Sequence, residues 1–367
     1  MTIRVPDVTT VLGLFSQYCS GRSLCCANGH ALMVAVSRST DGQVHMFNAF
    51  SNDRKRFSLN ALKVRKEDKW GNYVKGVYYN LNEMGINAGA VNICFSGPVL
   101  KGDNASLAGA ISVGVCLALR ELFGFRLSDS AIESLCLRSC TSYCNEQTRF
   151  SSIVTAMEAR EGQFLLFDLN TMTYRYIDSP FGNGVFSILA VDCKIPPSAM
   201  REEVLHRQLQ VREAFETLRK TTGHGSLRDV RISDLRERVL PVDETTRRIC
   251  ASVLEESAAA AAMENLFPAH DFVQIGKVFS RIGKIMRDDM ELSCPEIDWL
   301  IKRALEMPGC HGASMVFNGD NTYIALAMED SAVAAYTRRF EDYERIFGFK
   351  AKAVGFVPFG RWKTVTE

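Results

Sequence analysis

The sequence predicts an α+β fold with segregated layers, divided into two domains. Strand-like and helix-like segments follow one another irregularly, without the strict alternation that a doubly wound parallel sheet requires. The chain has 367 residues, 47% of them apolar, which is enough to bury a full core and is typical of two domains. It contains no internal repeat and no long linker rich in Gly, Ser or Pro.

Residue periodicity places the elements of the first half. Alternating apolar and polar residues predict strands, whereas apolar residues three or four positions apart predict helices. In the first predicted helix, for example, Val74, Val77 and Leu81 lie on one face. In chain order we expect strands at 31–37 and 43–49 around a turn at 40–42, a helix at 70–83, a strand at 91–95 and a helix at 104–123.

The second half begins with a hairpin and is then mostly helical. Asn170 supplies the turn between the two hairpin strands, and Gly223 and Gly225 mark the clearest loop. In chain order we expect hairpin strands at 163–169 and 173–177, a strand at 185–191, a helix at 198–220, a loop at 221–226, helices to about 304, and strands at 322–328 and 351–357 around a helix at 331–346.

Composition excludes several classes of partner. Lys and Arg number 43 against 42 Asp and Glu, so the charge balance gives no support for a nucleic-acid or membrane-surface partner. Residues 1–18 lack the pattern of a signal peptide, and we find no apolar run of about 18 residues that would span a membrane. Twelve cysteines without a secretory signal are typical of a reducing compartment, so we expect a cytoplasmic protein.

Three cysteines have a spacing that suggests either a metal site or core packing. Cys136, Cys140 and Cys144 recur every four residues, as on one face of a helix. No Cys-x-x-Cys pair or nearby His completes a tetrahedral ligand set. Cysteine also packs well as a small buried apolar residue, so we expect core packing and no metal.

Two motifs, one in each half of the chain, carry a family resemblance. The first is Trp-Gly-Asn-Tyr-Val-Lys-Gly-Val at 70–77, and the second is Ser-Cys-Pro-Glu-Ile-Asp-Trp-Leu at 293–300, preceded by Arg-Asp-Asp at 287–289. Both resemble signatures of galactokinases, a branch of the GHMP family of small-molecule kinases. The stretches 164–168 and 240–254 also align, so the resemblance covers nearly the whole chain.

The resemblance implies a fold and a reaction. It implies an N-terminal domain at 1–180, of the ribosomal-protein-S5-like α/β type, and a ferredoxin-like C-terminal domain at 181–367. It also implies transfer of the ATP γ-phosphate to the C1 hydroxyl of galactose with Mg²⁺, with both substrates bound where the two domains meet. The partners it implies are a sugar or another small alcohol, and a protein partner where the family has regulatory members.

The family's sugar-binding motif reads P-G-R-V-N-L-I-G-E-H-T-D-Y-N. Without gaps it falls on residues 6–19, where Gly13 and Tyr18 agree with it. The arginine position holds Val8, and the Glu, His and Asp positions hold Leu14, Phe15 and Gln17. Aligning Gly21-Arg22 with the motif's Gly-Arg is the alternative, but it requires a deletion of many residues. The resemblance therefore assigns Gly13, Leu14, Phe15, Gln17 and Tyr18 to the substrate site.

The phosphate loop of the family, P-x-G-x-G-L-S-S-S-A-S-L, falls on residues 99–107. Its final Ala-Ser-Leu is kept, but larger residues replace the preceding glycines, and Asp103 adds a negative charge. Bulk hinders the approach of backbone N–H groups to a phosphate, and a carboxylate repels it. A helix start without a nucleotide explains the stretch at least as well. The resemblance assigns nucleotide contacts to Lys101, Gly102, Asn104, Ala105 and Ser106.

The family's catalytic aspartate and two further positions are also replaced. Ser152 takes the place of the catalytic base in the motif G-I-M-D-Q, and a serine without its own base accepts no proton near neutral pH. Val204 replaces a tyrosine that reaches the sugar, although Arg207 of the same motif is kept. Only Gly319 remains of the third glycine-rich motif. No catalytic residue is retained in this alignment.

Three hypotheses follow from the pattern of losses. The chain is an active sugar kinase with a divergent site, a catalytically silent galactokinase homologue that binds a ligand or a protein, or a kinase for a less polar alcohol. Polar site positions have become apolar while the core pattern is intact, which favours the silent homologue. Leu14 and Phe15 would suit a less polar substrate, which keeps the third hypothesis open.

Overall fold

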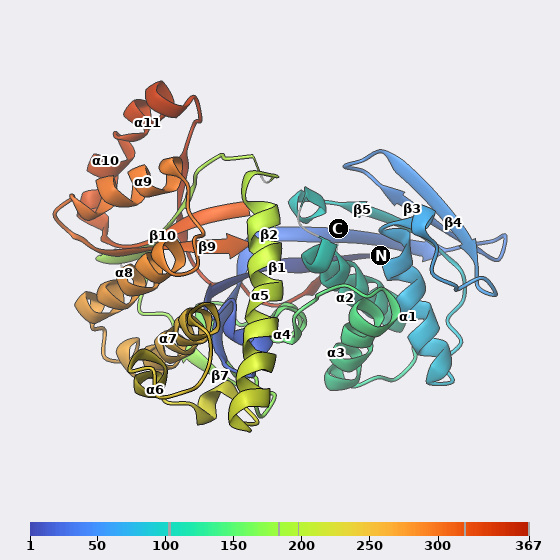
Figure 1. Ribbon diagram of the computed structural model, residues 1–367. Coiled ribbons are helices and arrows are strands. Elements are labelled where there is room, and N and C mark those ends of the chain that lie inside the picture. Colours follow the sequence, from blue (N-terminus) through green and yellow to red (C-terminus); the bar gives the residue numbers. More distant parts are fainter. Residues whose placement is uncertain (102–103, 183, 197, 319–320, 366–367) are drawn as a thin grey trace. The chain divides into compact units, whose positions relative to one another are not determined.

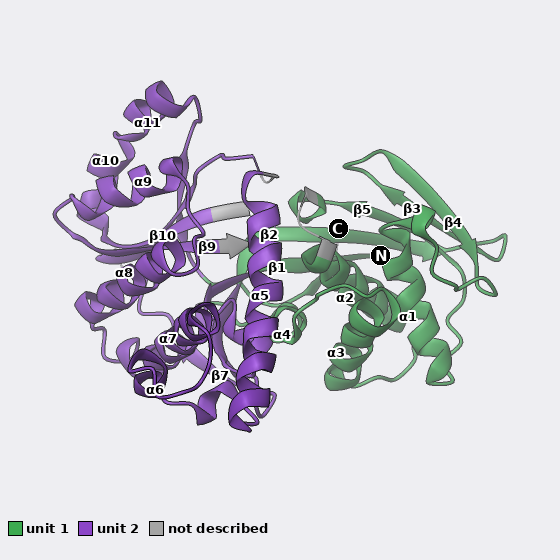
Figure 2. Ribbon diagram, in the orientation of Figure 1, with its two compact units in different colours: residues 1–8, 27–161, 358–367 green, residues 9–26, 162–357 purple. Residues whose placement is uncertain are grey.

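The structure, a computed structural model, describes residues 1–101, 104–182, 184–196, 198–318 and 321–365. Two compact units are interleaved along the chain, as Figure 2 shows by colour. Unit 1 consists of residues 1–8, 27–161 and 358–367, and unit 2 of residues 9–26 and 162–357. The division into domains 1–180 and 181–367 remains a proposal about domain organisation.

The larger sheet has eight strands, and six of them follow one another in a single path through unit 1. Their order is β12-β1-β2-β5-β3-β4, so β4 lies at one edge (Figure 1). β3 and β5 run parallel, whereas β2 is antiparallel to β5 and β4 is antiparallel to β3. The strands are β1 (Thr2–Leu12), β2 (Arg22–Arg38), β3 (Gln43–Asn48), β4 (Asp53–Ser58), β5 (Val91–Ser96) and β12 (Lys363–Val365).

Helices cover one face of this sheet and form the core of unit 1 with it. Alternate strand residues such as Val34, Val44 and Phe95 are fully buried against the helices, because successive strand side chains point to opposite faces. The helices are α1 (Gly71–Glu83), α2 (Asn104–Phe123), α3 (Asp129–Arg138) and α4 (Phe150–Glu158), with a π-helical turn at Ser139–Tyr143.

Helix α2 is the central helix of unit 1. From Ala105 to Phe123 it is long and apolar enough to cross a membrane, contrary to the expectation from the sequence, but 72% of that stretch is buried inside the protein. Burial on nearly every side explains the composition, since a helix without a polar face is typical of a core. Its length agrees with the helix predicted at 104–123.

Unit 2 contains a hairpin and a separate four-stranded antiparallel sheet. The hairpin strands β6 (Gln163–Asp168) and β7 (Thr173–Asp178) pair with each other, and β6 also pairs with β2 at residues 22–25. The second sheet has the order β11-β8-β10-β9. Its strands are β8 (Phe186–Asp192), β9 (Cys310–Asn318), β10 (Asn321–Glu329) and β11 (Lys352–Phe356).

Seven helices complete the described part of unit 2. Helix α8 approaches β9 closely, because Gly276 and Gly312 leave room for backbone against backbone. The helices are α5 (Ser198–Thr222), α6 (Ile232–Arg236), α7 (Glu244–Leu266), α8 (Phe272–Asp288), α9 (Pro295–Leu305), α10 (Asp330–Thr337) and α11 (Phe340–Phe347).

One predicted helix is wrong in its extent. The segment predicted as one helix at 331–346 is two helices, α10 and α11, joined at Arg338 and Arg339. The Arg339 N–H donates to the Tyr336 carbonyl, three residues back, which interrupts the ladder of bonds to the fourth residue back. Both Tyr336, on α10, and Tyr343, on α11, are fully buried. The prediction of a single straight helix did not include this break between them.

The cysteines are all free thiols, and eight of the twelve are buried. Cys136 and Cys140 are completely buried in the core of unit 1, which agrees with the predicted core packing, and Cys144 is half-buried. No group of three His, Cys, Asp or Glu side chains gathers to hold a metal ion anywhere in the described ranges. Burial raises the pKa of the Cys140 thiol to about 11.

Candidate functional site

The loop that follows β1 contains most of the predicted sugar-site positions. Gly13 turns the chain with φ of +82°, and a Cβ there would lie 2.2 Å from the Arg22 carbonyl oxygen. The turn therefore requires glycine for its backbone angle and for its close approach to β2. A short 3₁₀ turn, η1 (Ser16–Cys19), follows.

Leu14 and Phe15 point into the hydrophobic core of unit 2. Leu14 is 5% exposed and Phe15 is completely buried, in the same core as the second sheet and helices α7 and α8. Apolar side chains are stabilised in such a core by roughly 1.5–3 kcal/mol each. These two positions, which the resemblance assigns to sugar hydroxyls, therefore contribute to the core.

A buried carboxylate holds the backbone of the same loop. Glu256, on α7, accepts hydrogen bonds from the N–H groups of Leu14 at 2.7 Å, Phe15 at 2.9 Å and Ser16 at 3.2 Å. The neighbouring Ser257 hydroxyl accepts from the Arg22 N–H at 2.9 Å. Successive N–H groups that converge in this way form a concave anion site, and here a side chain of the same unit fills it.

Two opposing effects act on the Glu256 carboxyl. Burial raises its pKa, whereas the N–H donors of the loop lower it, and the balance lies at about 7. The carboxyl is 2% exposed, so water screens neither effect. Its ionisation and the shape of the loop are therefore linked.

The other predicted substrate positions of unit 2 lie on η1 and α5. The Tyr18 ring is 4.7 Å from the guanidinium carbon of Arg212 on α5, and both Tyr18 and Val204 are partly buried against the core. Arg207 is buried one turn after Val204, where it donates to Gln210 at 2.6 Å and to Glu291 at 3.1 Å. These contacts describe a packed helix–turn junction. Gln17 is half-buried, and Gly319 lies outside the described residues.

Two predicted catalytic positions lie in unit 1. Val8, at the arginine position, is half-buried in β1, and its side chain can neither donate nor accept a proton. Ser152, at the base position, is half-buried in the first turn of α4. The Ser152 hydroxyl forms no hydrogen bond with another side chain of the described chain. This pair of residues supplies neither a general base nor a cation.

The predicted nucleotide positions surround the start of α2. Lys101 ends a 3₁₀ turn, Asn104 begins the helix, and Gly102 lies outside the described residues. The carbonyl of Ala105 accepts a hydrogen bond from the Thr148 hydroxyl at 2.8 Å, so α2 is tied here to the connection before α4. Ser106 is half-buried.

Sequence reasoning missed Glu256. Two successive glutamates in an alanine-rich helix suggest a solvent-exposed surface. The spacing of the apolar residues around Glu256 nevertheless indicates burial. Position 256 lies on the helical face of Ile249, Val253, Ala260 and Met263, all of which are buried. A carboxylate in the apolar stripe of a helix needs partners, so this periodicity alone marks Glu256 as a site residue.

Known proteins resemble this chain over nearly its whole length. A Treponema pallidum protein whose name provisionally assigns it as a galactokinase is 27% identical, with 95% of this chain and 88% of that protein covered. A galactokinase of Streptomyces coelicolor is 26% identical, with 95% and 90% covered. A galactokinase of Thermotoga maritima is 23% identical, with 95% of each chain covered. No family model matches the chain.

Solved structures show the same fold. Lactococcus lactis galactokinase, determined in complex with galactose, superposes with a TM-score of 0.86 at 18% identity and covers 99% of this chain and 95% of its own. Methanococcus jannaschii mevalonate kinase superposes with a TM-score of 0.65 at 13% identity, with 98% of both chains covered. The fold is thus the two-domain α+β fold of these kinases. Together with the relatives of similar sequence, the fold supports the resemblance of this chain to the galactokinase branch of the GHMP kinase family.

Proposed function

We propose that this chain is a catalytically silent member of the galactokinase branch, or one so impaired that its rate of turnover is physiologically negligible. The reaction implied by the family is the ATP-dependent phosphorylation of galactose at C1. The proposal rests chiefly on the loop after β1, where Leu14 and Phe15 are buried in the core of unit 2. Cytoplasmic location belongs to the same proposal.

The loop has no group left for a sugar hydroxyl at these two positions. Their side chains are apolar and buried, and their N–H groups already donate to Glu256. A sugar hydroxyl placed against unpaired apolar surface loses its bonds to water, at a cost of roughly 1–3 kcal/mol. Opening the loop to bind sugar would in addition leave the Glu256 carboxylate without its donors.

The sequence at the nucleotide positions does not fit a triphosphate. A helix N-terminus attracts phosphate, but close approach needs glycines that this sequence replaces, and Asp103 adds a repelling charge. ATP with Mg²⁺, which the family implies, would supply the phosphoryl group and neutralise its charge. We therefore assign no catalytic step to residues of this chain.

The alternative is an active kinase for a less polar alcohol. This alternative requires Leu14 and Phe15 to line an apolar substrate pocket. Because both side chains are buried in the core of unit 2, neither is free to do so. The alternative would also need a base in place of Ser152, whose hydroxyl has no partner side chain to activate it among the described residues.

Calorimetry with an activity assay tests the proposal. Purified protein is titrated with Mg²⁺-ATP, with and without galactose, and ADP release is followed in the same samples. We expect no turnover, and the Thermotoga maritima relative serves as the positive control. Tight binding of both ligands with sustained ADP release would overturn the proposal.

A single substitution at the base position sharpens the test. We expect Ser152→Asp to leave galactose-1-phosphate formation undetectable, because the arginine position is Val8 and the sugar positions Leu14 and Phe15 are buried. Measurable product from this variant alone would show that a sugar site and a phosphate site exist elsewhere on the chain. The variant Ser152→Ala is the matched control for folding.

A further inference from the structure

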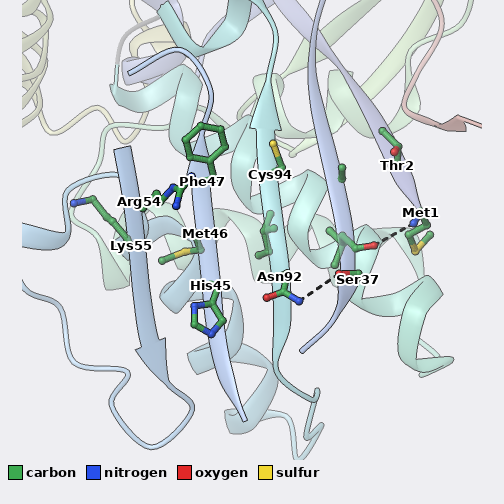
Figure 3. Close-up of a pocket in the computed structure, with 13 residues that line it drawn as sticks. Met1, Thr2, Ser37, His45, Met46, Phe47, Arg54, Lys55, Asn92 and Cys94 are labelled. Carbon is green, nitrogen blue, oxygen red and sulfur yellow. Dashed lines mark hydrogen bonds between the residues drawn. The ribbon is translucent and has the colours of Figure 1, made fainter. Parts of the chain in front are cut away.

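Among the described residues, no helix covers the second face of the unit 1 sheet, and this face forms a shallow cavity. Alternation buries one set of strand residues under α1–α4 and leaves the other set half-exposed or exposed. The cavity has a volume of about 520 Å³ and is lined by residues of β1–β5 (Figure 3).

Strand register arranges the exposed side chains in two rows across β4, β3, β5 and β2. The pairings that set the register are antiparallel between β4 and β3, parallel between β3 and β5, and antiparallel between β5 and β2. The first row is Arg54, Phe47, Cys94 and Ala35, and the second row is Arg56, His45, Asn92 and Ser37.

The rows have an apolar floor and a basic edge. Phe47 and Cys94 are half-buried at the centre, and the guanidinium carbon of Arg54 lies 5.4 Å from the centre of the Phe47 ring. Arg54 and Arg56 are exposed on β4, the strand at the sheet edge. His45 adds a third basic side chain, although its ring nitrogen is 2.8 Å from the Asp41 carboxylate.

The segment after β4 continues the basic edge. Residues 54–69 contain seven Lys and Arg against two Asp and Glu, while the whole chain carries +1, so the rest of the chain has an excess of negative charge. The segment returns along β4, since the Lys55 ammonium donates to the Glu67 carbonyl at 3.1 Å and the Trp70 ring N–H donates to Asp53 at 2.9 Å. Lys63, Arg65, Lys66 and Lys69 are exposed in it.

These cations have few partners compared with the arginines of unit 2. Arg54, Arg56 and Lys66 form no ion pair with any residue that the structure describes. In unit 2, by contrast, Arg228 is paired with Asp168 and Arg248 with Glu291. Unpaired guanidinium groups beside a half-buried aromatic ring are able to hold carboxylates in a two-pronged geometry.

We propose that this face is a docking surface for an acidic, extended segment of a protein partner. Such a segment would match it if acidic and apolar residues alternate along one of its faces, two positions apart in its sequence, with carboxylates on Arg54 and Arg56 and apolar side chains over Phe47 and Cys94. The small area and the apolar floor favour a peptide over the longer phosphate backbone of a nucleic acid. The role is separate from any kinase chemistry, and its failure would leave the proposed silence of the active site untouched.

A fluorescent extended peptide that carries glutamate and leucine in turn at every second position, so that both lie on one face, tests the proposal with the full chain. We expect saturable binding that weakens as salt is added, because exposed charges are screened. The double variant Arg54→Glu/Arg56→Glu should bind about tenfold more weakly or worse. The matched control Arg126→Glu/Arg338→Glu makes the same charge change at exposed arginines that do not line this cavity and should bind as the wild type does.

Cys94 gives a second measurement that locates the peptide. Its half-exposed thiol on the floor of the cavity should be alkylated more slowly when the peptide is bound, as measured by mass spectrometry of the Cys94 fragment.

Unchanged thermal unfolding of both double variants shows that folding is intact. No peptide binding, equal loss in the control variant, unprotected Cys94, or tighter binding of a single-stranded oligonucleotide than of the peptide would each overturn the proposal.

Discussion

Glu256 shows how one buried side chain can replace what a ligand would otherwise do for a loop. Three backbone N–H groups from Leu14 to Ser16 converge on it, and an unpaired buried N–H costs about 1–3 kcal/mol. The carboxylate satisfies all three donors from within unit 2. The loop therefore keeps its shape without an external anion or hydroxyl.

Replacing Glu256 should change how stability depends on pH. Because the pKa in the folded state, about 7, lies above the usual value of 4.5, the folded protein holds the proton more tightly than the unfolded chain. The stabilisation from this group is complete below about pH 4.5 and is lost as pH rises through 7, about 3 kcal/mol in all. Glu256→Gln should remove that slope between pH 5 and 8, roughly its steepest span.

Urea unfolding of both proteins across this range measures the difference. Glu133, whose pKa burial and the nearby Glu158 and Asp129 also raise to about 7, is present in both proteins, so its contribution cancels. Parallel profiles for wild type and variant would mean that Glu256 is ionised in the folded state throughout the range.

Restoring a family residue in the loop should destabilise the protein. Phe15 is completely buried, so Phe15→His places a polar ring without a partner in the core and leaves space unfilled. We expect a loss of about 2–4 kcal/mol in the free energy of unfolding, and no gain in galactose affinity. Chemical denaturation measures the loss, and Phe15→Leu, which stays apolar, should lose less. A stable variant that binds galactose would contradict the proposed loss of function.

At the scale of elements, the sequence predicted those with strong local patterns. The helix at 104–123 and the hairpin of β6 and β7 were both predicted, the first as a mostly apolar segment after a loop and the second by its turn residues. β1, β4, β9 and β12 were missed. β9 contains Gly312 and Ser314, which favour no strand, and its extended form comes from pairing with β10.

The difference between local patterns and contacts with distant segments also explains how much of the site was predictable. The positions of Leu14 and Phe15 in a loop followed from the alignment, because Gly13 and Tyr18 fix it. Their burial did not follow, since it depends on α7, more than 200 residues along the chain. A local pattern carries no information about which distant helix will cover it.

The contact of α8 with β9 gives a prediction at this scale. Helix propensity alone favours alanine over glycine by about 1 kcal/mol, so Gly276→Ala would be expected to stabilise α8. A Cβ on Gly276, however, would lie 2.2 Å from the His311 carbonyl oxygen. We expect a net loss of about 2–3 kcal/mol from this backbone clash. Gly355→Ala, whose Cβ would meet nothing within 4 Å, is the control and should be neutral in the same denaturation experiment.

At the scale of the whole molecule, the fold agrees with that of the solved kinases, whereas the proposed alignment replaces the polar residues of the site positions. A core that buries Ile, Leu, Val and Phe is present in both units, and the proposed losses fall on Val8, Ser152 and the loop after β1. Selection on stability would keep the apolar core, and only selection on turnover would keep the polar residues of the site. This contrast is what the proposed silent homologue predicts.

The dependence of thermal stability on added ligand tests the proposed silent homologue at the same scale. A ligand present at a hundred times its Kd adds about 2.7 kcal/mol to folding, which raises Tm by roughly 3–4 °C in a chain of this size. We expect millimolar Mg²⁺-ATP and galactose, alone or together, to shift Tm by less than about 1 °C, within the scatter of such measurements. The Streptomyces coelicolor relative, treated identically, should shift clearly. A comparable shift in this protein would mean that its binding site survives.

The distribution of thiols has a consequence for following the protein's motions. Cys116, Cys136 and Cys140 are buried in unit 1, and Cys19 and Cys250 are among those buried in unit 2. Each reacts with a thiol reagent only when its surroundings open. Pulsed labelling of the wild-type chain, read residue by residue, would therefore time the opening of each unit separately, with no dye or engineered probe to disturb the core.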